Sequence, residues 1–226
     1  MTHSAIPEPN LRRMPMYLLY LQKLTATDVK SISCVELGKA LGLDASQIRK
    51  DFETADIHGK PKVGYAVGEL IRSLEDRLGW NQRKPAVLAG AGPLGRALLG
   101  SETLKKSGLD VVGIFDSDGR EIGSTADNRE VMPLGFLPDV VRVHRVKLGI
   151  VAVGAATAQA VVDTMVKVGI EAIWSFVPAV LFVPEGVILH NGDLCSSFAP
   201  LSARIAEKRK ALLAMAPALQ PGYREE

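Results

Sequence analysis

Apolar residues recur at the spacing of an α-helix through the first part of the chain. Positions three, four and seven apart are apolar in several stretches, which predicts helices over residues 14–24, 35–41, 45–54 and 67–78. Pro15 suits the first turn of the first helix, where a missing N–H is tolerated. Ser33 and Glu36 have the spacing of a capping box at the start of the second helix, and Gly42 is a suitable residue to end it.

The segment after the third helix predicts a small β-hairpin. Asp44 is the N-cap candidate for the third helix, and the short turn before it contains a glycine, as in a helix-turn-helix. Within residues 57–65, two short extended pieces flank a Gly-Lys-Pro-Lys tip, which is the pattern of a hairpin or wing. The N-terminal segment therefore predicts a winged helix-turn-helix domain.

From residue 86 the pattern changes to short apolar strands that alternate with helices. The strands are predicted over residues 86–89, 111–115, 148–153 and 172–176. The helices are predicted over residues 94–106, 136–143, 156–168 and 200–214, the last of them basic. Such alternation is typical of an α/β fold with a Rossmann-type parallel sheet. The polar segment 79–85 divides the chain into two predicted domains, 1–84 and 85–226.

Composition narrows the class of protein. The 226 residues are 47% hydrophobic and 23% charged, as in ordinary globular proteins. No apolar stretch is long enough to span a membrane and the N-terminus lacks a signal-peptide core, so we expect a cytoplasmic protein without a membrane partner. Cys34 and Cys195 belong to no Cys/His cluster, so we expect no metal. The net charge of +2 divides into +3 for residues 1–84 and −1 for residues 85–226, which is compatible with a basic face on the first domain.

A glycine-rich loop carries the clearest chemical signal. The run Gly90-Ala91-Gly92-Pro93-Leu94-Gly95 follows a predicted strand and opens a predicted helix. In a Rossmann unit these glycines permit a tight turn, the approach of a pyrophosphate and close packing of the helix on the strand. Asp116 ends the next predicted strand, at the place of the acid that binds a ribose 2′-hydroxyl and repels a 2′-phosphate. The motif therefore predicts NAD(H) in preference to NADP(H).

A dinucleotide site by itself is compatible with several functions. A small NAD-dependent oxidoreductase would need a proton donor near the nicotinamide, and His190, expected in a surface loop, is the histidine with the most suggestive neighbours. The chain leaves no room for a large substrate domain, which argues against an enzyme. A Rossmann scaffold that senses another adenine nucleotide is a further alternative. The third hypothesis is a DNA-binding protein that responds to the nucleotide.

The N-terminal domain has the polar residues that a DNA reader needs. The second helix of a helix-turn-helix lies in the major groove, where glutamine pairs with adenine and arginine with guanine. Lysines on a wing contact phosphates or the minor groove, and a basic N-terminal arm does the same. The candidates from the arm, the helix and the wing are Arg12, Arg13, Ser46, Gln47, Arg49, Lys50, Lys60 and Lys62.

The order of these parts resembles the Rex family of redox-sensing transcriptional repressors. The resemblance covers about residues 6–210 and includes the glycine loop with Phe115-Asp116. Its other motifs are Arg13-Met14-Pro15-Met16-Tyr17, Gln47-Ile48-Arg49-Lys50-Asp51, Val63-Gly64-Tyr65, Phe176-Val177-Pro178 and Val183-Pro184-Glu185-Gly186-Val187. Arg-Lys-Asp and Val-Gly-Tyr in this order ahead of a Rossmann loop form a specific combination.

This resemblance implies a homodimer in which winged helices bind a palindromic double-stranded operator. The C-terminal helix would be domain-swapped onto the partner subunit. NADH would act as an effector that releases the DNA, and NAD⁺ would compete with it. The resemblance also implies that Val153, Gly154 and Asp193 contribute to the nucleotide site, with Asp193 reaching the nicotinamide pocket of the partner.

The chain departs from the family pattern at four places. Thr54-Ala55-Asp56 replaces Tyr-Phe-Gly after the recognition helix, and the wing tip is Gly59-Lys60-Pro61-Lys62. Proline cannot adopt the φ values of a wing glycine, so we expect the tip to differ. Ser101 stands where the family often has an aromatic residue, and Val153-Gly154 stands where it has Val-Pro.

Overall fold

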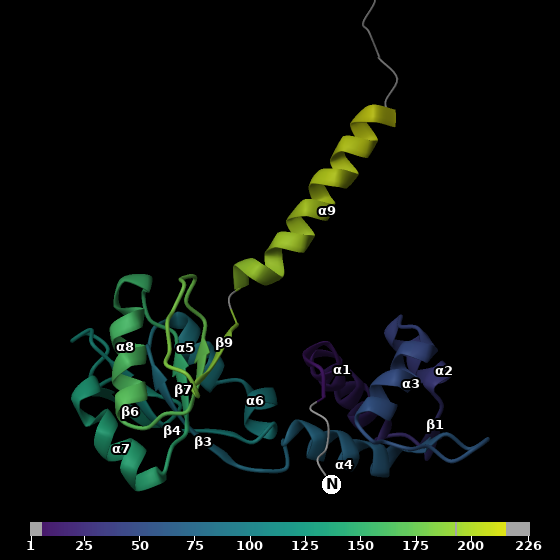
Figure 1. The fold of residues 1–226 in the computed structure, drawn as a ribbon, viewed down its shortest axis with the longest axis horizontal. Helices are drawn as coiled ribbons and strands as arrows, with labels where there is room; N and C mark the ends of the chain where they lie inside the picture. The colour runs from purple at the N-terminus through teal and green to yellow at the C-terminus, as the bar shows by residue number, and fades with distance from the viewer. Residues whose placement is uncertain (1–5, 193, 216–226) are drawn as a thin grey trace, which may run out of the picture. The chain divides into compact units, whose positions relative to one another are not determined.

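The computed structural model describes residues 6–192 and 194–215 (Figure 1). The chain forms two compact units. The first contains the residues up to Arg83 together with Glu102–Leu109, and the second contains Lys84–Ser101 and the residues from Asp110 onward. The chain therefore leaves the first unit, returns to it for a short segment, and leaves it again.

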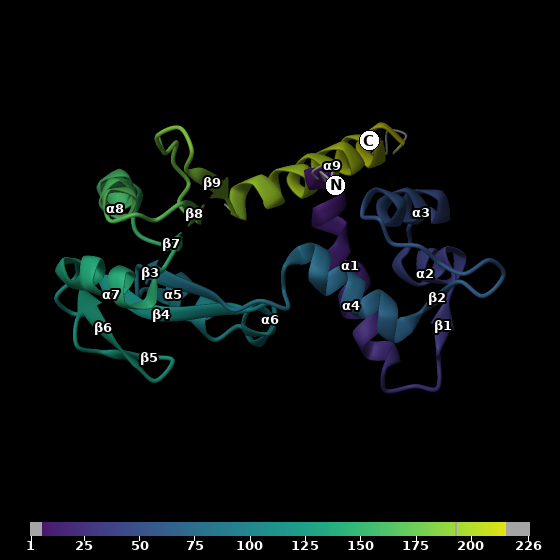
Figure 2. The same ribbon diagram turned by 60° about the horizontal axis from the view of Figure 1, so that its bottom comes forward.

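The first unit is helical, with a small antiparallel sheet. Its elements are α1 (Glu8–Leu24), β1 (Ser31–Ile32), α2 (Cys34–Leu41), α3 (Ala45–Thr54), β2 (Tyr65–Ala66), α4 (Val67–Leu78) and α6 (Glu102–Lys106). Helix α1 packs across α4, and α2 packs against α3 (Figure 2). These helices enclose an apolar cluster that includes Tyr17, Leu37, Phe52 and Leu74. The arrangement confirms the predicted winged helix-turn-helix.

The caps expected from the sequence are present around α2 and α3. The Ser33 hydroxyl accepts the Glu36 N–H at 3.2 Å, and the Glu36 carboxylate accepts the Ser33 N–H at 2.8 Å. Gly42 ends α2 in a left-handed conformation with φ 67°. The Asp44 carboxylate accepts the backbone N–H groups of Ser46 and Gln47. Each end of the turn between α2 and α3 is therefore fixed locally.

Two predictions for this unit differ from the structure. Helix α1 begins at Glu8, so Pro15 lies inside it and not in its first turn. The added residues 8–13 contain Leu11 among mostly polar side chains, which is too little to show a hydrophobic period. The wing is closed by a single bridge between Lys60 and Gly64, while β2 pairs with β1 and not with residues 57 and 58. Strands of two residues are too short to show alternation in a sequence.

The second unit is built on a sheet that has seven strands among the described residues, in the order β5-β6-β4-β3-β7-β8-β9. The strands are β3 (Lys84–Ala89), β4 (Leu109–Asp116), β5 (Thr125–Ala126), β6 (Arg129–Pro133), β7 (Leu148–Val151), β8 (Ala172–Ser175) and β9 (Ile188–Asn191). Strands β3, β7, β8 and β9 run parallel, β4 and β6 are parallel to each other, and β5 is antiparallel to β6. Without β5, this is the strand order of a Rossmann fold, which confirms the predicted class.

Helices connect the strands of the second unit. They are α5 (Pro93–Leu99), the 3₁₀ turn η1 (Leu134–Phe136), α7 (Leu137–His144), α8 (Ala155–Lys167) and α9 (Leu194–Met215). The single helix predicted over residues 94–106 is two helices, because α5 ends at Gly100 and α6 belongs to the first unit. Helix α9 begins before its predicted start and contains Pro200. Buried residues such as Val87, Phe115, Val151 and Ile173 form the core around the sheet.

Strand β9 corrects the expectation that His190 lies in a surface loop. His190 lies opposite Trp174 of β8 in a parallel pair, and its side chain is exposed. Strand β9 is mostly exposed, so its sequence shows no alternation of buried and exposed residues. The sequence pattern also did not predict β5 and β6. Strand β7 also ends at Val151, so Val153 and Gly154 lie in the turn before α8 and not in the strand.

Candidate nucleotide site and nucleic-acid interface

The glycine loop lies where the strand order of the sheet reverses. It joins the end of β3 to the start of α5, and the reversal falls between β3 and β7. Gly90 has φ 105°, and a Cβ placed on it would lie 2.3 Å from the Ala152 carbonyl oxygen. A Cβ on Gly95 would lie 1.9 Å from the Gly90 carbonyl oxygen. Both positions therefore require glycine, because any side chain would displace backbone.

Gly92 is a different case. Its φ is −66°, which any residue can adopt, and a Cβ placed on it would meet nothing within 4 Å. The packing of the protein thus does not require glycine here. The space over the first turn of α5 is open, Pro93 begins the helix, and the backbone N–H groups there are suited to a phosphate. The loop fits a pyrophosphate.

Asp116 ends β4 beside this loop. Its Oδ2 accepts the Ala91 N–H at 2.7 Å, and its Oδ1 accepts the N–H groups of Ser117 and Asp118 at 2.7 and 2.9 Å. The Gly90 N–H also donates to the Phe115 carbonyl oxygen at 2.8 Å. The structure therefore brings the glycine loop and the predicted ribose acid together, with the carboxylate held at the carboxyl edge of the sheet.

Arg96 forms hydrogen bonds beside the glycine loop, and the sequence pattern did not predict this role. From α5 it donates to the Thr125 carbonyl oxygen at 2.9 Å, to Glu121 at 2.7 Å and to the Ser124 hydroxyl at 2.8 Å. These bonds fix the segment that follows Asp116 against the glycine-loop helix. The partners lie 25 to 29 positions away, and their sequence contains no motif that would have identified them.

The turn after β7 lies against the same loop. The close approach of Gly90 to Ala152 places the following Val153 and Gly154 at this edge of the sheet. Val153 is half-buried and packs on the core, whereas Gly154 caps α8 and has open space around it. Asp193, the remaining candidate for this site, lies outside the described residues.

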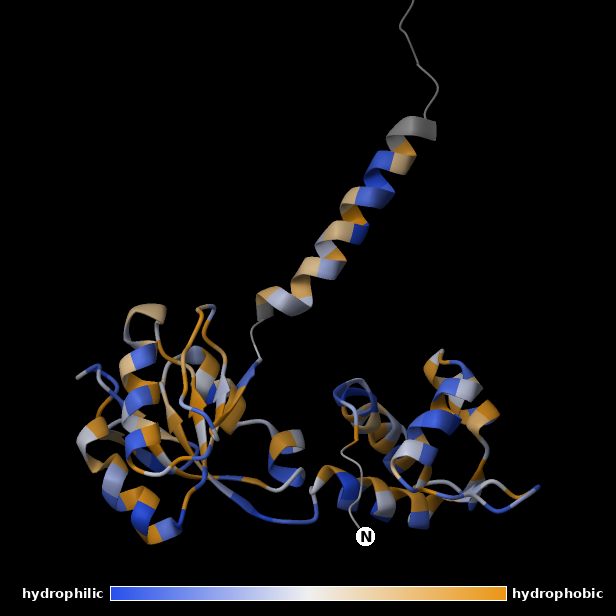
Figure 3. Ribbon diagram, in the orientation of Figure 1, coloured by the Kyte–Doolittle hydropathy of each residue, from blue (hydrophilic) through white to orange (hydrophobic). Residues whose placement is uncertain are grey.

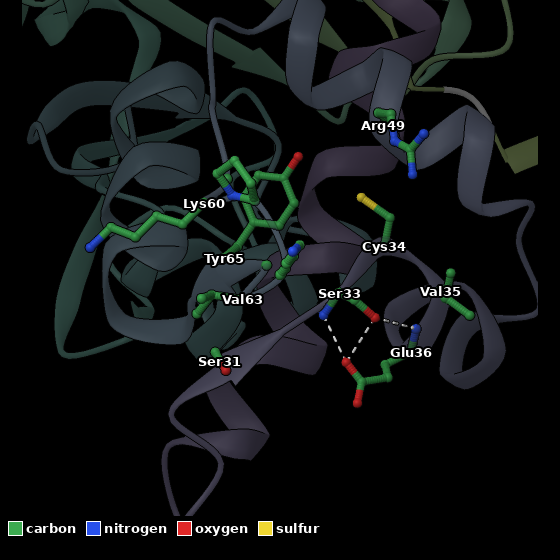
Figure 4. A pocket seen from close by; sticks show the side chains of 13 residues that line it. Ser31, Ser33, Cys34, Val35, Glu36, Arg49, Lys60, Val63 and Tyr65 are labelled. Atoms are coloured by element: carbon green, nitrogen blue, oxygen red, sulfur yellow. Dashed lines mark hydrogen bonds between the residues drawn. The ribbon is translucent and has the colours of Figure 1, made fainter.

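The second candidate surface lies on the first unit. A groove of about 750 Å³ is bordered by the start of α2, by α3 and by the wing, and Arg49, Lys60 and Lys62 line it. Figure 4 shows Arg49, Tyr65 and Cys34 grouped in this groove, with the Ser33–Glu36 cap beside them. Burial, with a smaller effect of the Cys34 thiol, raises the pKa of Tyr65 to about 12, so its phenol stays neutral.

The candidates on α3 are not equivalent. Arg49 and Lys50 are exposed, and within the described residues neither side chain forms an ion pair. The Ser46 hydroxyl donates to the Asp44 carboxylate at the N-cap. The Gln47 amide donates to the Asp51 carboxylate at 2.9 Å, so this side chain is held by its own helix.

Arg12 and Arg13 lie in α1, so they do not form the extended basic arm that the sequence suggested. Arg12 is exposed and pairs with Glu8 one turn earlier, at 2.7 Å. Arg13 turns inward and pairs with Asp51 of α3 at 2.6 Å. Because α1 extends back to Glu8, this part of the chain is helical where an arm would be extended.

At the wing tip, Lys62 adopts φ 63°, a conformation that favours glycine. Pro61 precedes it, and the turn is closed by the Lys60 N–H donating to the Gly64 carbonyl oxygen at 2.8 Å. The left-handed position of this tip is therefore occupied by a lysine. Asp56, before the wing, also has a positive φ of 56° and pairs with Arg77 of α4.

Two family models match parts of this chain. A family model described as "Putative DNA-binding protein N-terminus" matches residues 5–53, and one described as "CoA binding domain" matches residues 81–179. The redox-sensing transcriptional repressor Rex of Pelotomaculum thermopropionicum is 37% identical over 203 residues, which are 90% of this chain and 95% of that protein. The chain belongs to the Rex family of transcriptional repressors. The Rex protein of Treponema denticola is 38% identical over 89% of this chain and 96% of its own length.

Solved structures of RSP, a Rex-family repressor, also match this protein over nearly the whole chain. RSP in complex with β-NAD⁺ and operator DNA is 35% identical, with a TM-score of 0.84 over 95% of this chain and all of the RSP chain. RSP in complex with β-NADH gives a TM-score of 0.81 over 93% of this chain and 99% of RSP. The family resemblance in the sequence is thus confirmed, and membership of a repressor family sets aside the oxidoreductase alternative.

The described residues contain no group of three His, Cys, Asp or Glu side chains placed to hold a metal ion. Within residues 6–192 and 194–215, no helix is long and apolar enough to cross a membrane.

Proposed function

We propose that this protein is a homodimeric, cytoplasmic repressor that binds a palindromic operator and releases it when NADH binds. The observation that carries the proposal is the open glycine loop beside Asp116, in a chain that also has a winged helix-turn-helix. The relatives are named as redox-sensing repressors, which agrees with it. Residues 1–84 would bind DNA, and residues 85–226 would bind the nucleotide and dimerise.

NAD(H) would bind across the carboxyl edge of the sheet. The loop would hold the pyrophosphate and Asp116 the adenosine ribose, with Val153 and Gly154 beside them and Asp193 contributed at the nicotinamide end. The residues that form the loop are Gly90, Ala91, Gly92, Pro93, Leu94 and Gly95. The oxidation state of the bound nicotinamide supplies the signal, and the protein supplies the binding groups.

Helix α9 supports the homodimer. All of its residues from Cys195 to Leu212 are exposed. Apolar residues nevertheless recur along the helix among polar and charged ones (Figure 3), at Phe198, Leu201, Ile205 and Leu212. These positions are spaced by three, four and seven residues and so share one stripe. An exposed apolar stripe of this length is suited to a second copy of the chain, as expected for a swapped helix.

A DNA-binding experiment at controlled salt tests the proposal. We expect the protein to retard its own upstream DNA at constant ionic strength, and NADH to release that DNA, with NAD⁺ opposing the release. Calorimetric titration with NADH, NAD⁺, NADPH, ATP and coenzyme A identifies the effector, because the second family model describes a CoA-binding domain. Binding of ATP or coenzyme A in place of NADH would overturn the redox role and favour the sensor of another adenine nucleotide.

Replacing Asp116 with alanine tests the ribose contact. We expect Asp116→Ala to weaken NADH binding about tenfold and to reduce the preference for NADH over NADPH, because the carboxylate that excludes a 2′-phosphate is gone. Titration of both nucleotides measures the ratio. Asp118→Ala, which removes a carboxylate two residues after Asp116, is the control. Equal discrimination in Asp116→Ala and the wild type would refute the assignment.

Replacing Arg49 with alanine tests the recognition helix. If Arg49 pairs with a guanine, Arg49→Ala should weaken operator binding by about 1–3 kcal/mol and relax the preference at one base pair. Binding to a set of singly substituted operators at fixed salt measures both effects. Arg72→Ala, on the exposed side of α4, serves as the matched control. Unchanged operator affinity in Arg49→Ala contradicts the proposal.

Lys62→Gly is expected to have opposite effects on stability and on DNA binding. Glycine relieves the left-handed strain and should raise the free energy of unfolding by about 0.5–1 kcal/mol. The loss of one phosphate contact should weaken DNA binding and reduce the slope of log K against log salt by about 0.9. Arg145→Gly is the matched control, since Arg145 has φ 52° in the other unit. A salt slope unchanged by Lys62→Gly would exclude the phosphate contact.

A further inference from the structure

A fully buried carboxylate lies on the inner side of the recognition helix. Asp51 is in the second half of α3, and its side chain is completely inaccessible to solvent. Among the described residues, the other buried polar residue is Ser175, which lies in the second unit and carries no charge. A buried charge is retained only where its partners replace water, so the partners of Asp51 identify what it holds.

Four bonds from three side chains satisfy the two oxygens of Asp51. Arg13 of α1 donates through Nε to Oδ2 and through Nη2 to Oδ1, each at 2.6 Å. Tyr17 of α1 donates its hydroxyl to Oδ2 at 2.6 Å, and Gln47 of α3 donates Nε2 to Oδ1 at 2.9 Å. Asn10 also accepts from Arg13 at 3.1 Å, which fixes the guanidinium from the other side. The network cross-links α1 to the recognition helix.

The bonds give the helix a defined position as well as stability. A two-point guanidinium–carboxylate bond fixes direction as well as distance, which a single contact does not. Tyr17 adds a rigid ring that packs edge-on against Phe52 of α3, with ring centroids 5.6 Å apart. Because base readout depends on side-chain placement within about half an ångström, the azimuth of α3 about its own axis determines what Arg49 reaches.

We infer that Arg13 and Gln47 are positioning residues, which act on DNA through Asp51 by fixing the recognition helix and not by touching the DNA. The inference rests on the proposed function. It reassigns two residues that the sequence alone suggested as DNA contacts. Gln47 commits one of its two Nε2 N–H donors to Asp51, so its amide is oriented by its own helix. Base readout is then left to Arg49 and Lys50, with Ser46 engaged at the N-cap.

The test compares specificity with affinity in the full-length protein. The probes are the duplex that the wild type enriches from a randomised pool and a scrambled duplex of equal length. Arg13→Lys keeps the charge but loses the two-point bond. Gln47→Ala removes the amide from the network. The matched controls are Arg72→Lys and Gln22→Ala, which change the same residue types at exposed sites of α4 and α1. Thermal unfolding by circular dichroism establishes that each variant is folded at the assay temperature.

We define the specificity ratio as the affinity for the enriched duplex divided by the affinity for the scrambled duplex. We expect Arg13→Lys to lower this ratio about tenfold, with no change in the salt slope or in NADH binding. Gln47→Ala should lower discrimination at several base pairs together, and the controls should behave as the wild type. A phosphate-contacting Arg13 would be replaced well by lysine, so an unchanged ratio in Arg13→Lys overturns its positioning role.

Two further outcomes separate the hypotheses. If Arg13 and Gln47 had a merely structural role, their variants would have a lower melting temperature, but the folded variants would keep the wild-type ratio of affinities for the two duplexes. That result overturns the inference. Loss of preference at a single base pair in Gln47→Ala would make Gln47 a base reader and overturn its assignment. If the wild type enriches no sequence from the pool, the proposed function itself fails, and the inference with it.

Discussion

Asp51→Ala is expected to destabilise the first unit by about 3–5 kcal/mol, because it leaves the Arg13 guanidinium and the buried Tyr17 hydroxyl without their acceptor. Urea unfolding measures the loss. The fluorescence of Trp80 reports this unit, since Trp80 packs on its core, once Trp174 of the second unit has been replaced by phenylalanine. Glu8→Ala is the matched control. It breaks an exposed ion pair of the same type and should change the stability by no more than about 0.5 kcal/mol. A similar loss in both variants would refute the burial argument.

The same network makes the stability of this unit depend on acidity. Burial disfavours the charged form of Asp51, but its bonds from Arg13, Tyr17 and Gln47 outweigh burial and hold the pKa of this carboxyl below its ordinary 3.8. The contribution to stability is therefore complete above pH 3.8 and is lost as the pH falls through the lower value of the folded state. We expect the urea midpoint to fall over this acid range, and to fall less steeply in Asp51→Asn. Parallel curves for the two proteins would exclude Asp51 as the source.

Gly95→Ala is expected to reduce NADH affinity by about 100-fold or more, because the glycine loop must move to admit the methyl group. The new Cβ would lie 1.9 Å from the Gly90 carbonyl oxygen, and Gly90 is itself pressed against Ala152. Neither backbone can retreat by rotating a side chain. Calorimetric titration measures the affinity.

Gly100→Ala is the control for this substitution. Gly100 ends the same helix with φ −75°, and a Cβ there would be 3.6 Å from the Arg96 carbonyl oxygen, which is an ordinary contact. We expect nucleotide binding close to that of the wild type. Full NADH affinity in Gly95→Ala would show that the loop is not the nucleotide site.

Features with local causes were predictable from the sequence. The capping box of Ser33 and Glu36 acts over three residues, and the left-handed Gly42 ends the helix it follows. The glycine loop and Asp116 are separated along the chain, but the regular strand–helix–strand unit fixes their relation. In these cases a short stretch contained both partners of an interaction, or a standard motif joined them, and the sequence pattern agreed with the geometry.

Features that depend on distant partners were not predictable. Arg13 and Asp51 are 38 residues apart, and an exposed cation contacting DNA looks the same in a sequence as one that neutralises a buried acid. The same holds for Gln47, whose polarity suggested a base contact. Strand β9 was missed because it is largely exposed and therefore lacks an alternating pattern. For Arg13 and Gln47, the role is decided by the partner that the fold supplies.

The return of Glu102–Leu109 to the first unit limits how this protein can be divided. Gly108, with φ 84°, approaches the Gln82 carbonyl oxygen so closely that a Cβ there would lie 2.2 Å from it. A fragment that ends near residue 84 thus loses part of the unit it was meant to isolate. Recombination at that point would separate two segments that fold together. The first unit therefore cannot be transferred to another protein by a single recombination crossover. A hybrid sensor that keeps this DNA-binding unit intact would require two crossovers.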